Sequence, residues 1–290
     1  MRIIITGLTS YVGNALKNYL SSWPNFEIKI ISLRENLNAL NFKGCDVIFH
    51  AAGIAHDNAK KIQGAQNNLY YEINTGLTFK TALKAKSEGV RQFIFMSSAI
   101  VYGNSAPIGE NKIITSTTQP EPQSDYAESK LQAENKLLAL ENENFKICIV
   151  RAPMIYGKNS KGNYKLLSRL AKSTPIFPKI NNTRSMIYIK NLCEFIRLMI
   201  INNERGIFLP QNSEYVCTSN LVKEIAKAHG RKIFLIPGFK TLLKILARFT
   251  PLINKAFGNL AYDKNLSAYK SDYNIFSFEE SIKDSEEFLN

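Results

Sequence analysis

The chain has 290 residues, a formal net charge of +13, and 45% hydrophobic residues. A chain of this length can bury a full core, as one large α/β domain or as a core domain with a smaller lobe. Its apolar runs are too short for a secretory signal or a membrane span, so we expect a soluble, cytoplasmic protein. The basic residues are spread along the chain without a nucleic-acid motif, which argues against nucleic-acid binding.

Cysteines and histidines indicate no special chemistry. The four cysteines are far apart and three lie in apolar runs, so reduced thiols are expected. The three histidines have no spacing that a metal site needs, and no metal is expected.

The first half of the chain alternates short β-branched runs with helical stretches, which is typical of a parallel sheet covered on both faces. The expected strands are residues 2–6, 27–33, 46–51, 92–97 and 145–151. The expected helices are residues 12–22, 69–88 and 126–143. The predicted class is therefore α/β, with a Rossmann-type doubly wound parallel sheet.

The second half has a looser pattern and predicts a smaller C-terminal substrate-binding lobe. Helices are expected at residues 164–171, 192–201, 219–229 and 278–288, and strands at 207–209 and 232–236. The predicted division is a dinucleotide-binding core over residues 1–151 and a lobe over residues 152–290, interleaved with the last core strands.

The first expected strand runs directly into "TGLTSYVGNAL". Gly7 can take a tight turn, Gly13 can let the helix pack close to the sheet, and the amides at the start of the helix, at Tyr11 and Val12, would face a pyrophosphate. Ser10 replaces the middle glycine of the usual motif and fits if its φ is negative. An ordinary turn is the alternative.

The second expected strand, "EIKIISLR", ends without the acidic residue that would bind a ribose diol. Ser32 and Arg34 stand there instead and suit a 2′-phosphate, which favours NADP(H) and leaves NAD(H) as the alternative. The chain between Arg34 and Asp46 is too short for a helix–strand–helix unit. We therefore expect one strand of the usual sheet to be shortened or missing.

Three more stretches, "DVIFHAAG", "FIFMSSAIVYG" and "SDYAESK", fall at the carboxyl ends of expected strands, where such sheets bind ligands. With the TG-x5-G turn they resemble the extended short-chain dehydrogenase/reductase family, in particular its bacterial nucleotide-sugar epimerases and reductases. The resemblance continues through "RAPMIYG", "KGNYKLL", "NTRSMIYIKNL" and "SFEESIKDSEEFL", and covers nearly the whole chain.

The resemblance implies a catalytic centre of Ser98, Tyr126 and Lys130. Tyr126 and Lys130 lie four residues apart and share a helix face. Lys130 and a cationic nicotinamide would lower the pKa of Tyr126 toward neutrality, so that Tyr126 exchanges a proton with a sugar oxygen that Ser98 also binds. Ser97 is the rival of Ser98. The alternative is that Tyr126 packs on the sheet, Lys130 is solvated and Ser98 caps a turn.

Further residues are assigned by the same resemblance. Ala51, Ala52 and Gly53 would let the backbone approach the ribose and pyrophosphate of the cofactor. Asn74 would brace the active-site strand, and His50 is interpreted as a packed residue.

The expected substrate contacts come from both halves of the chain. Tyr102 would form a wall of the sugar pocket, and Asn163 and Arg184 would grip the substrate diphosphate. A surface role for Arg184 is the alternative.

Residues 239–257 are basic and contain no acid. Leu242, Leu243, Leu246 and Phe249 share one side, a pattern of helices that pack on a core and of helices that lie weakly on an anionic membrane; we favour the core. A homodimer through the helix of Tyr126 is expected by analogy only.

The sequence thus predicts an NAD(P)-dependent enzyme acting at C4 of a UDP-hexose in cell-surface polysaccharide synthesis. A 4-keto-reductase of the UDP-4-keto-6-deoxy-N-acetylhexosamine type is favoured, with a UDP-hexose 4-epimerase that retains NAD as the alternative. A non-catalytic NADP-binding regulator and a membrane-surface scaffold are hypotheses of other classes.

Overall fold

The computed structural model describes residues 1–34, 36–54, 66–160 and 162–287. It forms two compact units, of which the first comprises Met1–Gly103, Gln119–Ala152 and Cys193–Leu209. The second comprises Asn104–Thr118, Pro153–Leu192 and Pro210–Asn290. The chain passes from the first unit to the second after residue 152. In addition, residues 104–118 belong to the second unit, and residues 193–209 belong to the first.

The first unit contains a six-stranded sheet in which every pair of neighbours is parallel. Its order is β10 (Gly206–Phe208), β6 (Lys146–Ala152), β4 (Gln92–Ser98), β3 (Val47–His50), β1 (Arg2–Thr6) and β2 (Glu27–Ile31). The strands predicted in the first half all form, within two residues of the expected ends. The predicted α/β class with a doubly wound parallel sheet is confirmed.

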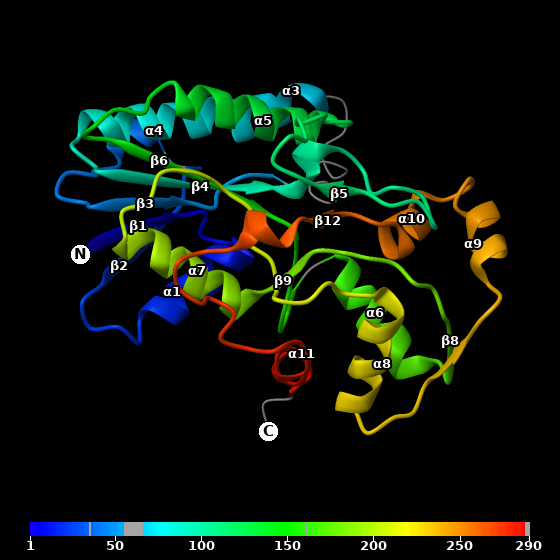
Figure 1. The fold of residues 1–290 in the computed structure, drawn as a ribbon. Helices are drawn as coiled ribbons and strands as arrows, with labels where there is room; N and C mark the ends of the chain where they lie inside the picture. Colours follow the sequence, from blue (N-terminus) through cyan, green and yellow to red (C-terminus); the bar gives the residue numbers. More distant parts are fainter. Residues whose placement is uncertain (35, 55–65, 161, 288–290) are drawn as a thin grey trace. The chain divides into compact units, whose positions relative to one another are not determined.

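Helices lie on both faces of this sheet (Figure 1). One face carries α4 (Thr78–Ser87) and α5 (Asp125–Leu138), and the other carries α1 (Tyr11–Leu20) and the later part of α7 (Ile189–Ile201). The predicted helix 69–88 is composite: α3 (Gln66–Tyr70) leads into a π-helical stretch, Tyr71–Leu77, and then into α4. π-Helical turns in proteins often occur at functional sites, and this stretch carries the buried Asn74.

The core under α4 and α5 explains why these segments fold as they do. Alternate residues of the central strands point to this face, and small residues on the two helices let them approach closely. The members are fully buried, and they include Ile48, Phe93, Phe95, Ile147, Ile149, Ala82, Ala85 and Ala133. This packing fixes α5, and therefore Tyr126 and Lys130, over the sheet.

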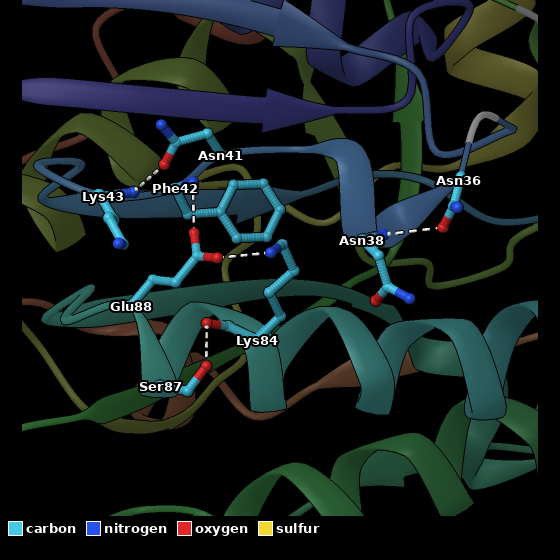
Figure 2. A network of polar contacts seen from close by, with 8 residues as sticks. All are labelled: Asn36, Asn38, Asn41, Phe42, Lys43, Lys84, Ser87 and Glu88. Atoms are coloured by element: carbon cyan, nitrogen blue, oxygen red, sulfur yellow. Dashed lines mark hydrogen bonds and ion pairs between the residues drawn. The ribbon is translucent and has the colours of Figure 1, made fainter.

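The connection from β2 to β3 contains a single 3-10 turn, Leu37–Ala39, among its described residues, and β2 is the edge strand. The predicted loss of one strand is therefore confirmed. Figure 2 shows how this short connection is held: Glu88, just after α4, accepts a hydrogen bond from the Phe42 amide at 2.5 Å and pairs with Lys84. The Phe42 ring is fully buried beneath them. The end of α4 thus anchors the connection.

The second unit is built on three two-stranded parallel pairs, which are β7 (Met154–Tyr156) with β9 (Met186–Tyr188), β8 (Ile176–Pro178) with β11 (Phe234–Ile236), and β5 (Ile113–Ile114) with β12 (Ala261–Tyr262). Its helices are α6 (Asn163–Ser173), α8 (Thr218–Ala228), α9 (Lys240–Leu246), α10 (Pro251–Phe257) and α11 (Phe278–Glu286), with a 3-10 turn at Lys264–Ser267. The predicted end of the last helix, at residue 288, lies outside the described residues.

The basic stretch of this unit differs from the favoured interpretation. Of the four apolar residues expected to pack on a core, only Leu243 is buried, whereas Leu242, Leu246 and Phe249 are exposed. The core-packing prediction for this stretch is therefore wrong. In the described part of the chain, no helix has the length and apolar character needed to cross a bilayer.

Candidate active site

The turn after β1 has the form that a phosphate-binding loop requires. Gly7 has φ +96°, and a Cβ on it would lie 3.0 Å from the amide nitrogen of Ala52 and 3.1 Å from the carbonyl carbon of Ala51. A Cβ on Gly13 would lie 3.1 Å from the Cγ2 of Ile5 on the sheet. Both positions therefore need glycine, the first for its backbone conformation and the second for the close approach of α1.

Ser10 fits its place in this turn because its φ is −68°. Its side chain caps α1, with the Oγ accepting a hydrogen bond from the Gly13 amide at 3.1 Å. Tyr11 and Val12 follow as the first residues of the helix, at the end where the helix dipole is positive. The loop therefore has the geometry for a pyrophosphate, and the Ser10 hydroxyl tightens it.

The end of β2 carries the residues expected to choose between cofactors. Ser32 and Arg34 follow the strand directly, and the Ser32 Oγ accepts a hydrogen bond from the Arg34 amide at 3.2 Å. The Arg34 side chain is exposed. A turn held by the serine thus leaves the guanidinium group in solvent beside the sheet edge, where it is accessible to an anion.

Asn74, in the π-helical stretch, holds the loop after β3. Its buried side chain accepts a hydrogen bond from the Ile54 amide at 2.9 Å and donates to the Ile54 carbonyl and to the Ser129 Oγ, each at 3.1 Å. A Cβ on Gly53 would lie only 2.9 Å from the Asn74 Oδ1. One amide therefore links the Ala51–Gly53 segment to α5.

His50, at the end of β3, is packed, as predicted. Its ring is buried between the hydroxyls of Thr6 and Thr78, at 3.1 and 3.0 Å. Burial lowers the pKa of His50 to about 3, so the ring is neutral in the folded protein.

Tyr126 and Lys130 lie on α5, which begins after Ser124, whose Oγ accepts a hydrogen bond from the Ala127 amide at 3.2 Å. The Lys130 ammonium donates to the Met96 carbonyl at 2.9 Å and lies 4.6 Å from the centre of the Phe95 ring. It is also 3.6 Å from where a Cβ on Gly53 would stand. Lys130 is therefore a buried residue beside the predicted cofactor loop, and the solvated alternative is wrong.

The pKa of Tyr126 differs from the expectation. Burial, reinforced by the neighbouring Tyr70, raises it to about 12, and burial lowers the pKa of Lys130 to about 8. Because burial disfavours the phenolate, the protein's own residues do not produce the predicted lowering toward neutrality, and the effect of a cationic nicotinamide on this pKa stays a prediction. Tyr126 holds its proton at neutral pH, while Lys130 changes charge near physiological pH.

Ser97 and Ser98 have different surroundings. The Ser97 hydroxyl donates to the buried carboxylate of Glu134, whereas Ser98 is partly exposed and its Oγ accepts a hydrogen bond from the Ile100 amide at 3.3 Å. The Ser97 hydroxyl is thus buried and already bound by Glu134. This arrangement favours Ser98 as the residue that can reach a substrate, while it also caps the following turn.

A buried ion pair behind these serines was not anticipated. Arg151 on β6 binds the Glu134 carboxylate through two nitrogens, the shortest contact being 2.6 Å, and its Nη1 donates to the Tyr102 hydroxyl at 2.7 Å. Glu134 lies four residues after Lys130 and raises its pKa in opposition to burial. In the sequence, Glu134 follows Lys130 by four residues, just as Lys130 follows Tyr126. This spacing places the three side chains on one helix face.

Asn163 and Arg184 belong to the second unit, and both contact the end of α10. The Asn163 Nδ2 donates to the Lys255 carbonyl at 3.4 Å, and the Arg184 Nη1 donates to the Gly258 carbonyl at 3.2 Å. Arg184 is buried, so the surface alternative is wrong. Burial lowers its pKa to about 10, and no carboxylate among the described residues pairs with its guanidinium.

Comparisons with known proteins identify the family of the chain. Residues 3–209 match the model of the NAD dependent epimerase/dehydratase family. The chain belongs to this family. The resemblance to extended short-chain dehydrogenases/reductases is thereby confirmed, and with it an enzyme of that type.

Similar proteins in this family include epimerases and reductases. A UDP-glucose 4-epimerase of Vibrio cholerae is 28% identical over 288 residues, which cover 90% of this chain and 87% of the relative. Several solved structures share the fold over 98% of this chain, and two of them show the range of named activities. They are UDP-glucuronic acid 4-epimerase of Bacillus cereus with NAD (TM-score 0.74, 15% identity, 97% of that chain) and dTDP-4-dehydrorhamnose reductase of Bacillus anthracis str. Ames with NADP (TM-score 0.73, 19% identity, 98% of that chain).

Proposed function

We propose that the protein is an NADPH-dependent reductase that converts a 4-keto group of a UDP-linked hexose to the alcohol. The observation that carries this choice is the end of β2, where Ser32 and Arg34 stand in place of a carboxylate. A carboxylate at this point binds the 2′-hydroxyl of NAD and would repel a 2′-phosphate, whereas an exposed guanidinium attracts it. An exchangeable NADPH suits a reductase, because an epimerase returns the hydride that it removes.

The residues of the site fit a dinucleotide. The Gly7 turn, the first turn of α1 and the Ala51–Gly53 segment lie together, and added methyl groups at Gly7 or Gly53 would meet backbone or Asn74 atoms. We assign the pyrophosphate to Gly7, Ser10 and the helix start at Tyr11, Val12 and Gly13. When bound, the cofactor supplies the hydride.

The protein's own residues then handle the proton. A phenol with a pKa of about 12 is protonated at neutral pH, which is the form required to donate a proton to the oxygen that forms at C4. Ser98 would hold that oxygen by a hydrogen bond. Lys130, with a pKa near 8, can return a proton to Tyr126 after turnover, and its bond to the Met96 carbonyl keeps it in place.

The substrate class rests on the second unit and on the relatives. Arg184 offers a desolvated guanidinium that suits a diphosphate, and Asn163 lies against the same end of α10. The Vibrio cholerae relative is named for a UDP-sugar. A UDP-linked sugar is therefore the proposed substrate.

Turnover with a defined substrate tests this proposal. We expect purified protein to oxidise added NADPH when given UDP-4-keto-6-deoxy-N-acetylglucosamine, with one NADPH consumed for each ketone reduced. Absence of NADPH oxidation, together with interconversion of UDP-hexoses at C4 without net cofactor change, would contradict the reductase.

That second result would support the alternative, a UDP-hexose 4-epimerase that retains NAD. The observation that favours it is the similarity to the Vibrio cholerae epimerase along 90% of the chain. Both reactions use the same three residues, Ser98, Tyr126 and Lys130. The cofactor found in the purified protein separates them: tightly held NAD for the epimerase, and exchangeable NADPH for the reductase.

The preference for NADPH can be tested at Arg34. We expect Arg34→Ala to weaken NADPH binding about tenfold while NADH binding stays unchanged, because only NADPH carries the 2′-phosphate. Lys29→Ala removes an exposed cation from β2 itself and serves as the control. Equal loss of both cofactors in Arg34→Ala would exclude recognition of the 2′-phosphate.

A further inference from the structure

Helices α9 and α10 present apolar side chains to solvent. Phe249 is 81% exposed, Leu252 58%, Leu242 49% and Ile245 48%, although each is a residue that folded proteins usually bury. These four define what we call the α9–α10 surface, which lies wholly within the second unit. Exposed apolar residues gathered on one short segment indicate a contact surface rather than the scatter found on every protein.

The lysine side chains of α9 are exposed, and their carbon stems pack on the protein surface. A Cβ placed on Gly109 would lie 2.8 Å from the Cε of Lys240 and 3.4 Å from the Cε of Lys244, so the lysine stems lie over this glycine. Leu243 is the buried residue that anchors the helix. Apolar and basic side chains of α9 are thus exposed together, with the lysine stems along the protein surface and Leu242 and Ile245 open to solvent.

Next along the chain, α10 is firmly held to its unit. Its Phe257 packs on Phe177 of β8 with ring centres 5.6 Å apart, and its first turn is capped by the Thr250 Oγ, which accepts a hydrogen bond from the Leu252 amide at 3.4 Å. The helices follow β11 in the chain (Figure 1). The exposure of Phe249 and Leu252 is therefore a property of a packed segment.

Charge identifies the kind of partner. No acidic residue occurs between Gly230 and Asp263, whereas this interval contains Arg231, Lys232, Lys240, Lys244, Arg248 and Lys255. The strand pair β8–β11 adds two more exposed apolar side chains, Ile176 and Phe234, which stand opposite each other in the register. A segment with outward apolar groups and only positive charges of its own is complementary to an apolar layer under negative headgroups.

We propose that the α9–α10 surface docks the protein on a membrane that contains anionic lipid. Phe249 and Leu252 enter the boundary between headgroups and acyl chains, and the lysine and arginine side chains reach the lipid phosphates at their edge. The contact is reversible and peripheral. It does not depend on which reaction the first unit catalyses.

Co-sedimentation with vesicles tests the proposal on the full chain. We expect binding to equimolar phosphatidylcholine and phosphatidylglycerol, weaker binding at high salt, and little binding to phosphatidylcholine alone, because the positive charges need an anionic surface. No binding to the anionic vesicles at low salt would overturn the proposal.

Two variants separate the apolar and the charged contributions. Phe249→Ser should weaken vesicle binding about tenfold or more, since it removes the side chain that enters the lipid. Lys244→Gln/Arg248→Gln should weaken binding by a similar factor and reduce its salt dependence. Ile201→Ser, at an exposed apolar residue on α7, is the matched control and should bind like the unchanged protein. Equal binding by all the variants would overturn the proposal.

A second copy of the chain is the rival occupant of this surface. Sedimentation velocity without lipid distinguishes the two: we expect the same oligomeric state for the unchanged protein and for Phe249→Ser. A shift of Phe249→Ser to a smaller species would assign the surface to an interface between copies and overturn membrane docking.

Discussion

Two buried arginines, one in each unit, show how the same side chain can serve opposite purposes. Arg151 in the first unit is bound by the Glu134 carboxylate and by the Tyr102 hydroxyl, and these partners raise its pKa. Arg184 in the second unit has no ion pair among the described residues, and burial lowers its pKa. A buried charge with its partner stabilises a framework, whereas a buried charge without one is suited to bind an anion.

The largest effect on stability is expected when the ion pair between Arg151 and Glu134 is broken. Arg151→Met leaves the fully buried Glu134 without its cation, so the free energy of unfolding should fall by about 3–5 kcal/mol in chemical denaturation. Arg2→Met, which breaks the exposed pair with Glu27, should cost no more than about 1 kcal/mol. Equal losses in the two variants would contradict the account of Arg151.

The next largest effect is expected at Lys130, where the free energy of unfolding should depend on pH. Its pKa is about 8 in the folded protein against 10.5 in the unfolded chain, so between these values the unfolded chain holds more protons. The contribution of Lys130 to stability should therefore rise with pH across this window, by on the order of 3 kcal/mol, and Lys130→Met should lack this contribution. Denaturation at several pH values measures it.

Lys136→Met, on the exposed side of the same helix, is the control for this experiment. It should keep the rise of the unchanged protein. If Lys130→Met showed the same pH dependence as Lys136→Met, Lys130 would not be a desolvated ammonium.

The smallest effect on stability is expected at Arg184. Arg184→Met removes a desolvated cation, so the free energy of unfolding should stay equal or increase by about 1–2 kcal/mol. Binding of UDP, measured by calorimetry, should weaken at least about tenfold in the same variant. Lys179→Met, at an exposed cation of the same unit, should change neither quantity. A destabilised Arg184→Met that still binds UDP normally would make Arg184 a structural residue.

Local signals were enough to predict the first unit. Its strands and helices follow from alternating and helical periodicity, and the order of the motifs identified the family. The missing strand after β2 followed from chain length alone. The placement of Tyr126 and Lys130 on one face of α5 followed from their spacing of four residues.

Contacts between distant residues were not predictable in this way. The pair of Glu134 and Arg151 joins two different elements, α5 and β6, and the raised pKa of Tyr126 depends on its burial and on the neighbouring Tyr70. The apolar residues of α9 show a helical pattern that is equally typical of a buried face, so their exposure could be learned only from the packing of Lys240 on Gly109.

The central claim is that the phenol of Tyr126 donates the proton at a nicotinamide-binding site, and Tyr126→Phe tests it most directly. With NADPH and UDP-4-keto-6-deoxy-N-acetylglucosamine, the rate of NADPH oxidation should fall about 10²–10⁴-fold, while NADPH binding measured by fluorescence stays unchanged. A Tyr126→Phe protein that oxidised NADPH at the rate of the unchanged protein would contradict the account.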